Sequence, residues 1–395
     1  MVVRAVIVTT LTTVLTTLLA TVAACGNGVK TVVEQPSAVR GPPGPIVVAE
    51  AWQKQDKRGT HLVFVGLDGR RKGDLTTFAN LKTRVGSQWI AHRDRAPAWS
   101  PDGKWIVFQS TRGRSPRAGQ IKTSLWLIEA RTGRQPRRLT DVEGSDRDPV
   151  WTPDGKQIVF ASNRGGSWDL WRGAVRSNRH GRMRLDSPVR ITFDKTAELQ
   201  PSVSPDGKQV VFRASDTKGR SRLRIVPMVG GATIPLTAGP DDNSPAWSPK
   251  GNLIAFSSPG KRQLKTGAIR NLDLQVVKPD GTNRRVLWAD TVFAMETLPR
   301  WSRDGRYLFA TSLLRGLANG KPILSSLLVI DLREQTINAR VLHDIVLTDR
   351  FGTAIAPKVL NSTELLRNHT YRQGLRRVLD RQIWRTIDQN LRKTK

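Results

Sequence analysis

Cysteine is almost absent from this chain. Its 395 residues include one cysteine, Cys25, so no disulfide can form within a single chain. The sequence also lacks the Gly-x-Ser-x-Gly motif that exposes a hydrolase nucleophile. Histidine is scarce, and the five residues do not have the spacing of metal ligands: His61, His92, His180, His343 and His369. We therefore expect no catalytic residues, no metal and no cofactor.

Acidic residues are also few. The chain has 64 Lys and Arg against 33 Asp and Glu, which gives a formal net charge of +31. Such a charge favours anionic partners, namely phospholipid head groups, acidic glycans or acidic proteins. The alternative is a compositional bias of the genome with no role in binding. The sequence contains no recognised nucleic-acid motif, so we do not expect DNA or RNA as a partner.

The N-terminus is uncharged over a long stretch. Arg4 is followed by Ala5 to Ala24 without a charge, and then by Cys25. This pattern resembles a bacterial lipoprotein signal, which implies removal of residues 1–24 and lipidation of Cys25. The alternatives are an uncleaved membrane anchor and an ordinary signal with an incidental cysteine. Residues 25–45 are rich in Gly and Pro and are expected to form a flexible tether.

One phrase occurs five times in the remaining chain. Its glycines are Gly103, Gly155, Gly207, Gly251 and Gly305, which are 44 to 54 residues apart. The copies read Trp99-Ser100-Pro101-Asp102-Gly103, Trp151-Thr152-Pro153-Asp154-Gly155, Val203-Ser204-Pro205-Asp206-Gly207, Trp247-Ser248-Pro249-Lys250-Gly251 and Trp301-Ser302-Arg303-Asp304-Gly305. Pro, Asp and Gly at these places predict a tight turn between two strands. A period of this length predicts stacked structural repeats.

The strands expected after each turn are apolar on both faces. They are Trp105–Phe108, Gln157–Phe160, Gln209–Phe212, Leu253–Phe256 and Tyr307–Ala310. Further strand candidates in the first and last repeats are 124–128, 138–140, 327–330 and 340–342. Antiparallel sheets covered on both faces and repeated along the chain predict an all-β protein, a β-propeller with four strands in each blade.

A further blade is expected from the two ends of the repeat region. Residues 46–52, 60–65 and 75–78 read as the last three strands of a blade without its first. Residues 351–356 could supply that strand and close a ring of six blades, which would leave no open edge. The expected propeller thus covers residues 46–360.

The Trp-Ser-Pro-Asp-Gly-Lys copies resemble the TolB-like β-propeller repeat, which is also found in the propellers of oligopeptidases and of some sugar lyases. The resemblance implies a β-propeller fold. It implies function only weakly, because the motif builds a turn and the fold carries unrelated activities. About twenty residues separate Cys25 from the first expected strand, so the α/β domain that precedes the propeller in TolB is not expected here.

Each copy also carries an acidic residue five positions before its first residue: Asp94, Asp146, Glu198, Asp242 and Glu296. If the strand that follows is the innermost of its blade, as in the family that it resembles, these carboxylates form a ring at one mouth of the central channel. The functional interpretation is a partner-binding site for a cation, an amine or a basic segment. The structural alternative is that each carboxylate caps its own loop or pairs with an arginine such as Arg93, Arg95 or Arg147.

The C-terminal segment 361–395 differs from the repeats. Apolar residues three or four apart alternate with arginines from Ser362 to Leu391, which predicts a basic amphipathic helix. Such a helix either lies on an anionic membrane or a partner, or packs on the outside of the propeller.

Two functions are consistent with these features. The first, implied by the resemblance, is a lipid-anchored and non-catalytic platform that binds proteins of the cell envelope. The second is a binder of anionic glycans or lipids, and a hydrolase or lyase is a distant third. Gly26 after Cys25 resembles lipoproteins retained at the periplasmic face of a Gram-negative outer membrane.

Overall fold

The structure is a computed structural model of the chain. The lipoprotein signal, Cys25, the tether, Glu296, the expected closing strand 351–356 and the segment 361–395 lie outside the described residues, so what was expected of them stays a prediction. The described residues are 46–54, 57–65, 71–76, 82–85, 88–112, 122–130, 136–177, 183–239, 241–263, 270–288, 294–295, 299–315, 322–332 and 336–341.

All regular elements of the described residues are β-strands, and their pairing is antiparallel. The first sheet has three strands, β1 (Ile46–Lys54), β2 (Lys57–Val65) and β3 (Arg71–Asp74). A two-stranded hairpin follows, β4 (Lys82–Val85) and β5 (Gln88–Ala91). The next two sheets are β6 (Asp94–Trp99), β7 (Trp105–Ser110), β8 (Ser124–Glu129) and β9 (Arg137–Arg138), then β10 (Asp146–Trp151), β11 (Gln157–Ser162), β12 (Asp169–Ser177) and β13 (Met183–Arg190).

Three more sheets continue the pattern, and in each the spatial order follows the chain. Two of them are β14 (Ala197–Val203), β15 (Gln209–Ser215), β16 (Ser221–Pro227) and β17 (Ile234–Pro235), then β18 (Asn243–Trp247), β19 (Ile254–Gln263), β20 (Arg270–Val277) and β21 (Arg285–Trp288). The last is β22 (Ala294–Met295), β23 (Arg300–Trp301), β24 (Tyr307–Arg315), β25 (Pro322–Asp331) and β26 (Thr336–Val341), where β22 and β23 both pair with β24.

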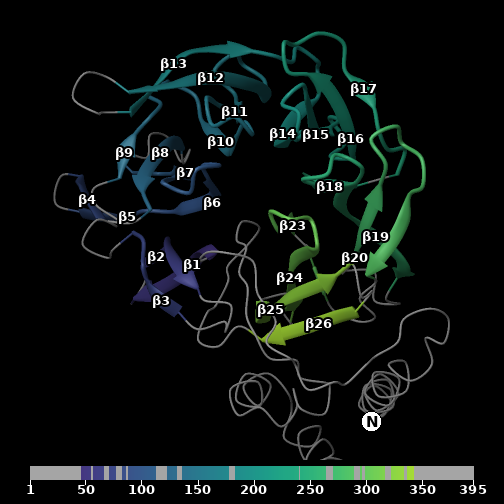
Figure 1. Ribbon diagram of the computed structural model, residues 1–395. Helices are drawn as coiled ribbons and strands as arrows, with labels where there is room; N and C mark the ends of the chain where they lie inside the picture. Colours follow the sequence, from purple (N-terminus) through teal and green to yellow (C-terminus); the bar gives the residue numbers. More distant parts are fainter. Residues whose placement is uncertain are drawn as a thin grey trace, which may run out of the picture.

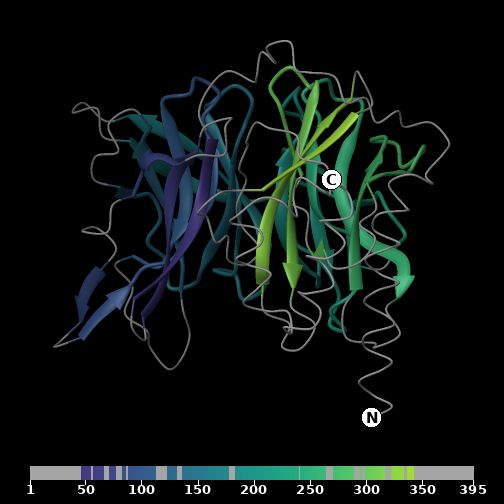
Figure 2. The ribbon, with the colours of Figure 1, turned by 90° about the horizontal axis from the view of Figure 1, so that it is seen from below.

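The sheets stand around a central opening, with β6, β10, β14, β18 and β23 next to it (Figure 1), and Figure 2 shows the same ring of sheets from the side. This arrangement confirms the all-β class and the β-propeller. From β6 onward each four-stranded sheet begins at its innermost strand and proceeds outward, as the resemblance to the TolB-like repeat implied. The number of six blades stays a prediction, because the strand expected to close the ring is outside the described residues.

The repeated turn is held by the side chains that define it. In the first copy the Ser100 hydroxyl donates to Asp102 Oδ1 at 2.6 Å and accepts from the Trp105 backbone N–H at 2.9 Å. The Lys104 N–H also donates to Asp102 Oδ1, at 3.0 Å. Gly103 has a φ of 71°, which glycine adopts without strain. The hydrogen bonds from Ser100 and Lys104 lower the pKa of Asp102, so the turn is strongest when this carboxyl is ionised.

The hydrophobic core lies between adjacent blades. Phe108, Phe160, Phe212 and Phe256 occupy the same place in four successive second strands and are fully buried. Val159 of β11 and Phe212 of β15 belong to one packed cluster although they come from different blades. Each blade therefore completes the core of its neighbour, which is the packing that repeat proteins require.

Two local features differ from the expectation. The third strand of the first sheet is Arg71–Asp74, earlier than the predicted 75–78. Leu75 and Thr76 still bond through their N–H groups to the Leu62 carbonyl, but without continuing the ladder. The β4–β5 hairpin was not predicted, although the two residues between its strands, Gly86-Ser87, are a hairpin turn signal.

Candidate functional site

The acidic residues of the repeat lie where the innermost strands begin. Asp94 and Asp146 are the first residues of β6 and β10, Glu198 is the second of β14, and Asp242 immediately precedes β18. All four side chains are 0% exposed. They therefore lie inside the blades, and the backbone of each is bonded to a neighbouring blade. The Asp146 N–H, for example, donates to the Thr123 carbonyl at 3.0 Å.

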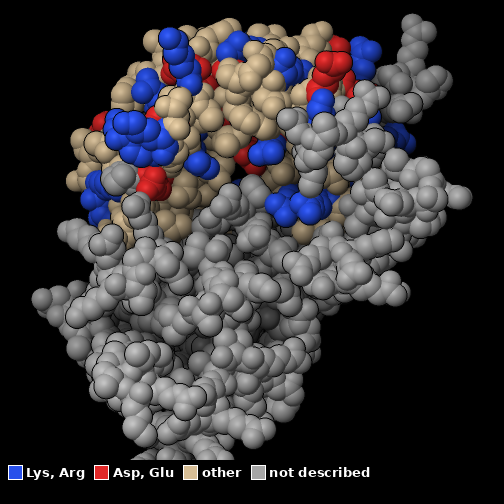
Figure 3. All heavy atoms as spheres, turned by 180° about the vertical axis from the view of Figure 1, so that it is seen from behind, with Lys and Arg blue, Asp and Glu red and all other residues tan. Residues whose placement is uncertain are grey.

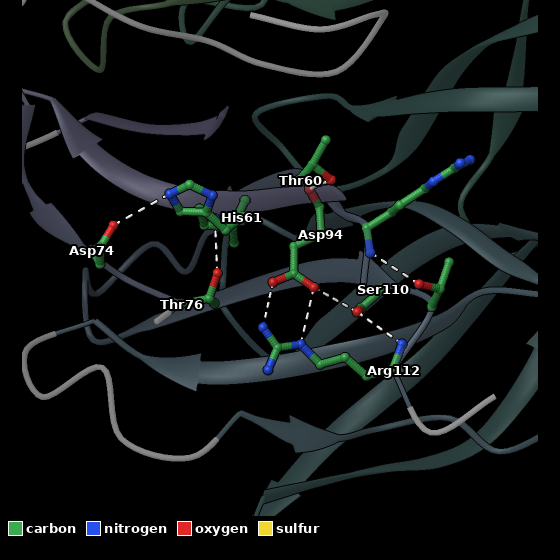
Figure 4. Close-up of polar contacts among 10 residues, drawn as sticks. Thr60, His61, Asp74, Thr76, Asp94, Ser110 and Arg112 are labelled. Carbon is green, nitrogen blue, oxygen red and sulfur yellow. Dashed lines mark hydrogen bonds and ion pairs between the residues drawn. The ribbon is translucent and has the colours of Figure 1, made fainter. Parts of the chain in front are cut away.

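Asp94 is enclosed by groups from its own blade (Figure 4). Arg112 donates to its two oxygens, from Nη2 to Oδ2 at 2.5 Å and from Nε to Oδ1 at 3.1 Å. The Ser110 hydroxyl adds a bond to Oδ1 at 2.6 Å, and the Thr60 hydroxyl of the preceding sheet donates to the Asp94 carbonyl at 2.8 Å. The carboxylate is thus neutralised within its own blade, and the backbone carbonyl of Asp94 joins this blade to the preceding sheet.

The same arrangement recurs in two other blades. Arg164 donates to Asp146 Oδ1 at 2.9 Å, and Arg284 donates to both oxygens of Asp242 at 3.0 Å each. Each arginine also lies over a buried phenylalanine of its own blade. The distances from the guanidinium carbon to the ring centroid are 6.0, 5.3 and 5.0 Å for Arg112–Phe108, Arg164–Phe160 and Arg284–Phe256. This geometry favours the structural alternative for Asp94, Asp146 and Asp242, with partners other than the arginines named from the sequence.

Glu198 departs from this pattern. Arg112 and Arg164 each stand eighteen positions after their acid, but the residue at that place after Glu198 is Asp216. Neither carboxyl oxygen of Glu198 has a hydrogen-bond partner among the described residues. Burial raises the pKa of Glu198 to about 8. Two neighbouring groups modify this pKa. The Thr192 hydroxyl lowers it, although it is not placed for a normal hydrogen bond, and the Asp194 carboxylate raises it further. At neutral pH the Glu198 carboxyl is therefore mostly protonated.

A β-bulge follows each acid, and the sequence analysis missed it. The residue two positions further has a left-handed backbone although it is not glycine: Ala96 (φ 48°), Asp148 (φ 50°), Gln200 (φ 55°) and Ser244 (φ 53°). A proline follows each of them, and the strand register shifts at the same points. Such backbones are strained and need support from their surroundings.

That support comes from a relay of side chains between blades. Gln109 Oε1 accepts from the Asp148 N–H at 3.0 Å, and Asp148 Oδ2 accepts from the Gln200 N–H at 3.2 Å. Gln200 Oε1 then accepts from the Ser244 N–H at 2.9 Å. Four successive blades are thereby linked next to the central opening.

Arginines surround Asp148 in this relay. Burial raises the pKa of Asp148, and the charges of Arg147, Arg300 and Arg213 lower it. Burial lowers the pKa of Arg147 and Arg300, and Asp148 raises both. Protein atoms lie close enough to Arg300 to lower its pKa, but the residue is still exposed to solvent. Several guanidinium groups thus influence the pKa of Asp148, whereas Asp94 forms an ion pair with Arg112.

The described residues contain no group of three or more His, Cys, Asp or Glu placed to hold a metal ion. His61 is buried and its Nε2 lies 3.4 Å from Asp74 Oδ1 (Figure 4), and His92 is also buried. The other three histidines lie outside the described residues. None of the described residues forms a helix that could span a membrane.

Comparison with known proteins supports the fold. A family described as the TolB beta propeller domain matches residues 78–270. A Tol-Pal system protein TolB of Francisella tularensis subsp. holarctica is 28% identical over 248 residues, which covers 52% of this chain and 53% of the relative. An uncharacterized protein of Agrobacterium fabrum is 30% identical over 169 residues, covering 40% of this chain and 52% of the relative. The chain thus spans about half the length of the curated relatives it matches.

Among solved structures, TolB from Acinetobacter baumannii covers 81% of this chain and 69% of its own, with a TM-score of 0.50 and 16% identity. The hydrazine synthase of Kuenenia stuttgartiensis covers 82% of this chain and 48% of its own, with a TM-score of 0.54 and 14% identity. Identities this low show the fold alone. The same fold thus occurs in proteins with different roles.

Proposed function

Because this chain is a TolB-like β-propeller protein, we propose that it acts in the cell envelope as a non-catalytic platform for protein–protein interaction. The observation that carries this proposal is the match of the propeller repeats to proteins named for the Tol-Pal system. The match covers about half of those relatives, so the assembly with Tol-Pal type partners is itself part of the proposal.

The partner surface is proposed to lie on the loops that the acidic residues hold in place. Asp94, Asp146 and Asp242 are buried and paired, so they would act by fixing these loops and not by touching a partner. Arg93, immediately before Asp94, is exposed and lies at the start of an innermost strand. Loops carried by a rigid scaffold are where binding residues concentrate.

Membrane attachment through Cys25 is the second part of the proposal. A lipid chain on Cys25 and the Gly- and Pro-rich residues up to position 45 would hold the propeller near the membrane while it remains free to turn. Fractionation of cells that produce the Cys25→Ser variant tests this part. We expect the variant to leave the membrane fraction, and an unchanged distribution would contradict lipid anchoring.

The alternative is binding of anionic glycans or lipids through the basic surface. Lys and Arg side chains are spread over the described part of the face in Figure 3, with Asp and Glu between them. The net charge of +31 favours this alternative. Contacts with a polyelectrolyte weaken steeply with salt, whereas a packed protein interface weakens less.

Site-specific crosslinking separates the two functions. A photo-reactive amino acid at Arg93 in the full chain tests the loop face, and the same substitution at Arg176, whose side chain is 66% exposed on β12, is the matched control. The platform predicts one defined envelope protein crosslinked from position 93 and not from 176, at low and high salt. Label found only on lipid or glycan, or equally from both positions, would overturn it.

A further inference from the structure

We propose that the fourth and fifth repeated turns bind an acidic segment of a protein partner, whose carboxylates contact Lys250 and Arg303. Both residues are exposed, and they belong to two turns that touch each other. This site goes beyond the proposed function, because it lies on a different face of the propeller. Each repeated turn follows the innermost strand of its blade, whereas Arg93 precedes such a strand.

The first argument is that the fourth turn is built around a lysine. Lys250 stands where the other four copies carry aspartate. That aspartate accepts the hydroxyl bond of its turn, as Asp206 Oδ1 does from Ser204 at 2.5 Å. In the fourth copy, Ser248 donates instead to Asn252 Oδ1 at 3.1 Å. The turn thus keeps an acceptor at another position, and its fold does not need the cation at position 250.

The second argument is the contact between the two turns. In the earlier pairs of successive turns, the glycine of one turn faces the proline of the turn before it, as Gly251 faces Pro205. A Cβ atom on Gly305 would also lie 3.6 Å from Cγ and 3.7 Å from Cε of Lys250. The Lys250 side chain therefore lies against the fifth turn. That turn contains Arg303, which stands where the other copies carry proline.

The third argument is the local charge. The first three turns each carry one aspartate and one lysine, whereas the fourth and fifth together carry Lys250, Arg303, Arg306 and one carboxylate, Asp304. Asp304 Oδ1 already accepts from the Ser302 hydroxyl at 2.5 Å and from the Arg306 N–H at 3.0 Å. Neither the Lys250 nor the Arg303 side chain has a hydrogen bond or ion pair among the described residues. Both are therefore available to added carboxylates.

A short acidic segment fits this site better than a membrane does. A surface that binds a membrane combines cations with apolar side chains that enter the lipid. Among the residues that the structure describes, the large exposed apolar side chains lie outside the repeated turns: Val189, Phe193, Val229, Ile234 and Val286. The excess of positive charge is confined to two neighbouring turns. An ammonium and a guanidinium on adjacent turns suit carboxylates that follow one another along a chain.

Lysine footprinting of the full chain tests the site. The protein is acetylated with and without hexaglutamate, and mass spectrometry gives the rate at each lysine. The ratio of the two rates is the protection of that lysine. We expect hexaglutamate to protect Lys250 at least about 5-fold, but less than about 2-fold the lysines of the first three turns, Lys104, Lys156 and Lys208. Hexaglutamine is the neutral control peptide and should protect none of the four.

Two variants change the site in opposite directions and keep the lysine that is measured. Arg303→Pro restores the proline of the other copies and should lower the protection of Lys250 at least about 3-fold. Its control, Arg222→Met, removes an exposed arginine from β16 and should change this protection less than about 1.5-fold. Asp304→Asn removes the competing carboxylate but keeps an oxygen acceptor, as Asn252 does in the fourth turn. It should raise the protection about 2-fold, which loss of folding cannot imitate.

Three results would overturn the site: equal protection of all four lysines, protection by hexaglutamine, or unchanged protection in Arg303→Pro. Vesicles of phosphatidylglycerol in place of the peptide test a lipid as the occupant. Protection of Lys250 by vesicles and not by hexaglutamate would overturn the acidic segment. None of these results bears on the crosslinking from position 93, so the two proposals fail separately.

Discussion

Two blades of this propeller each bury a carboxyl group at the same position of the repeat, but they compensate for its charge in different ways. In the blade that starts at β6, the buried carboxylate of Asp94 accepts hydrogen bonds from Arg112 and Ser110. In the blade that starts at β14, the carboxyl of Glu198 is equally buried, but Ala214 and Asp216 stand where that serine and arginine would be. The first blade balances the charge with a guanidinium and the second with a proton.

The difference shows which part of the repeat the fold requires. Both blades keep the acidic position, the bulge after it and the backbone bond to the neighbouring blade; the Glu198 N–H donates to the Trp168 carbonyl at 2.8 Å. The arginine partner is replaceable, because protonation also removes the buried charge. Stability of the second blade should therefore fall as pH rises through the raised pKa of Glu198.

The largest expected effect is removal of the guanidinium in the first blade. Arg112→Met leaves the Asp94 carboxylate buried without its cation and should lower the free energy of unfolding by about 3–5 kcal/mol. Arg220→Met is the control, because Arg220 is 56% exposed in its pair with Asp216 and should contribute less than about 1 kcal/mol. Urea unfolding at pH 7 measures both. Similar losses in the two variants would show that burial of the pair does not matter.

Next in size is Glu198→Gln, which removes the titration of the second blade. The folded pKa of about 8 lies above the ordinary 4.5, so the folded chain binds the extra proton and stability falls as pH rises from about 4.5 to about 8. The amide avoids this loss and should stabilise the protein by about 2–4 kcal/mol at pH 8 and hardly at pH 4. Thermal unfolding across this pH range checks the prediction. A gain independent of pH would contradict it.

A smaller gain is expected from giving the second blade the partner of the first. Ala214→Ser/Asp216→Arg places a hydroxyl and a guanidinium at the positions that serve Asp94 and should add about 1–2 kcal/mol at pH 8. The gain is limited because Asp216 accepts bonds from the Lys218 and Arg220 N–H groups of its own loop. Carboxyl NMR should show the pKa of Glu198 fall. A pKa that stays near 8 would mean that the new arginine does not reach it.

The smallest effect concerns the turn that both blades share. Asp206→Ala removes the acceptor of the Ser204 hydroxyl and of the Lys208 N–H, and should cost about 1 kcal/mol. Lys208→Ala, in the same exposed turn, keeps both bonds and should stay within about 0.5 kcal/mol. Asp102 and Asp206 are both exposed, so burial does not change the free energy that either contributes. Asp102→Ala in the first blade should therefore lower the free energy of unfolding by the same amount. Unequal costs would show that the turns are not interchangeable.

The turns and strands could be predicted because their cause is local. Pro, Asp and Gly define the turn within five residues, and the apolar run after it defines a covered strand. The acidic set was also visible from its spacing. Its arginine partners share a fixed distance in two blades, Arg112 and Arg164, and the same comparison of repeats would have revealed them.

Burial and backbone strain could not be predicted in the same way. A left-handed residue before a proline is unfavourable by itself, and Asp148 holds it only because Gln109 of another blade accepts its N–H bond. Whether Asp94 faces solvent or the core also depends on Arg112, eighteen residues later, and on Thr60 of the preceding sheet. Spacing along the sequence therefore could not show that these carboxylates are buried.

The relay of bonds beside the opening has a direction. At each of its three described steps the accepting side chain lies in the earlier blade and the donating N–H in the later one, from Gln109 through Asp148 and Gln200 to Ser244. A ribosome releases the N-terminal blade first. Each folded blade would therefore supply the acceptor that holds the strained bulge of the next blade. The blades would then form in chain order during synthesis, each one guiding the folding of the blade after it.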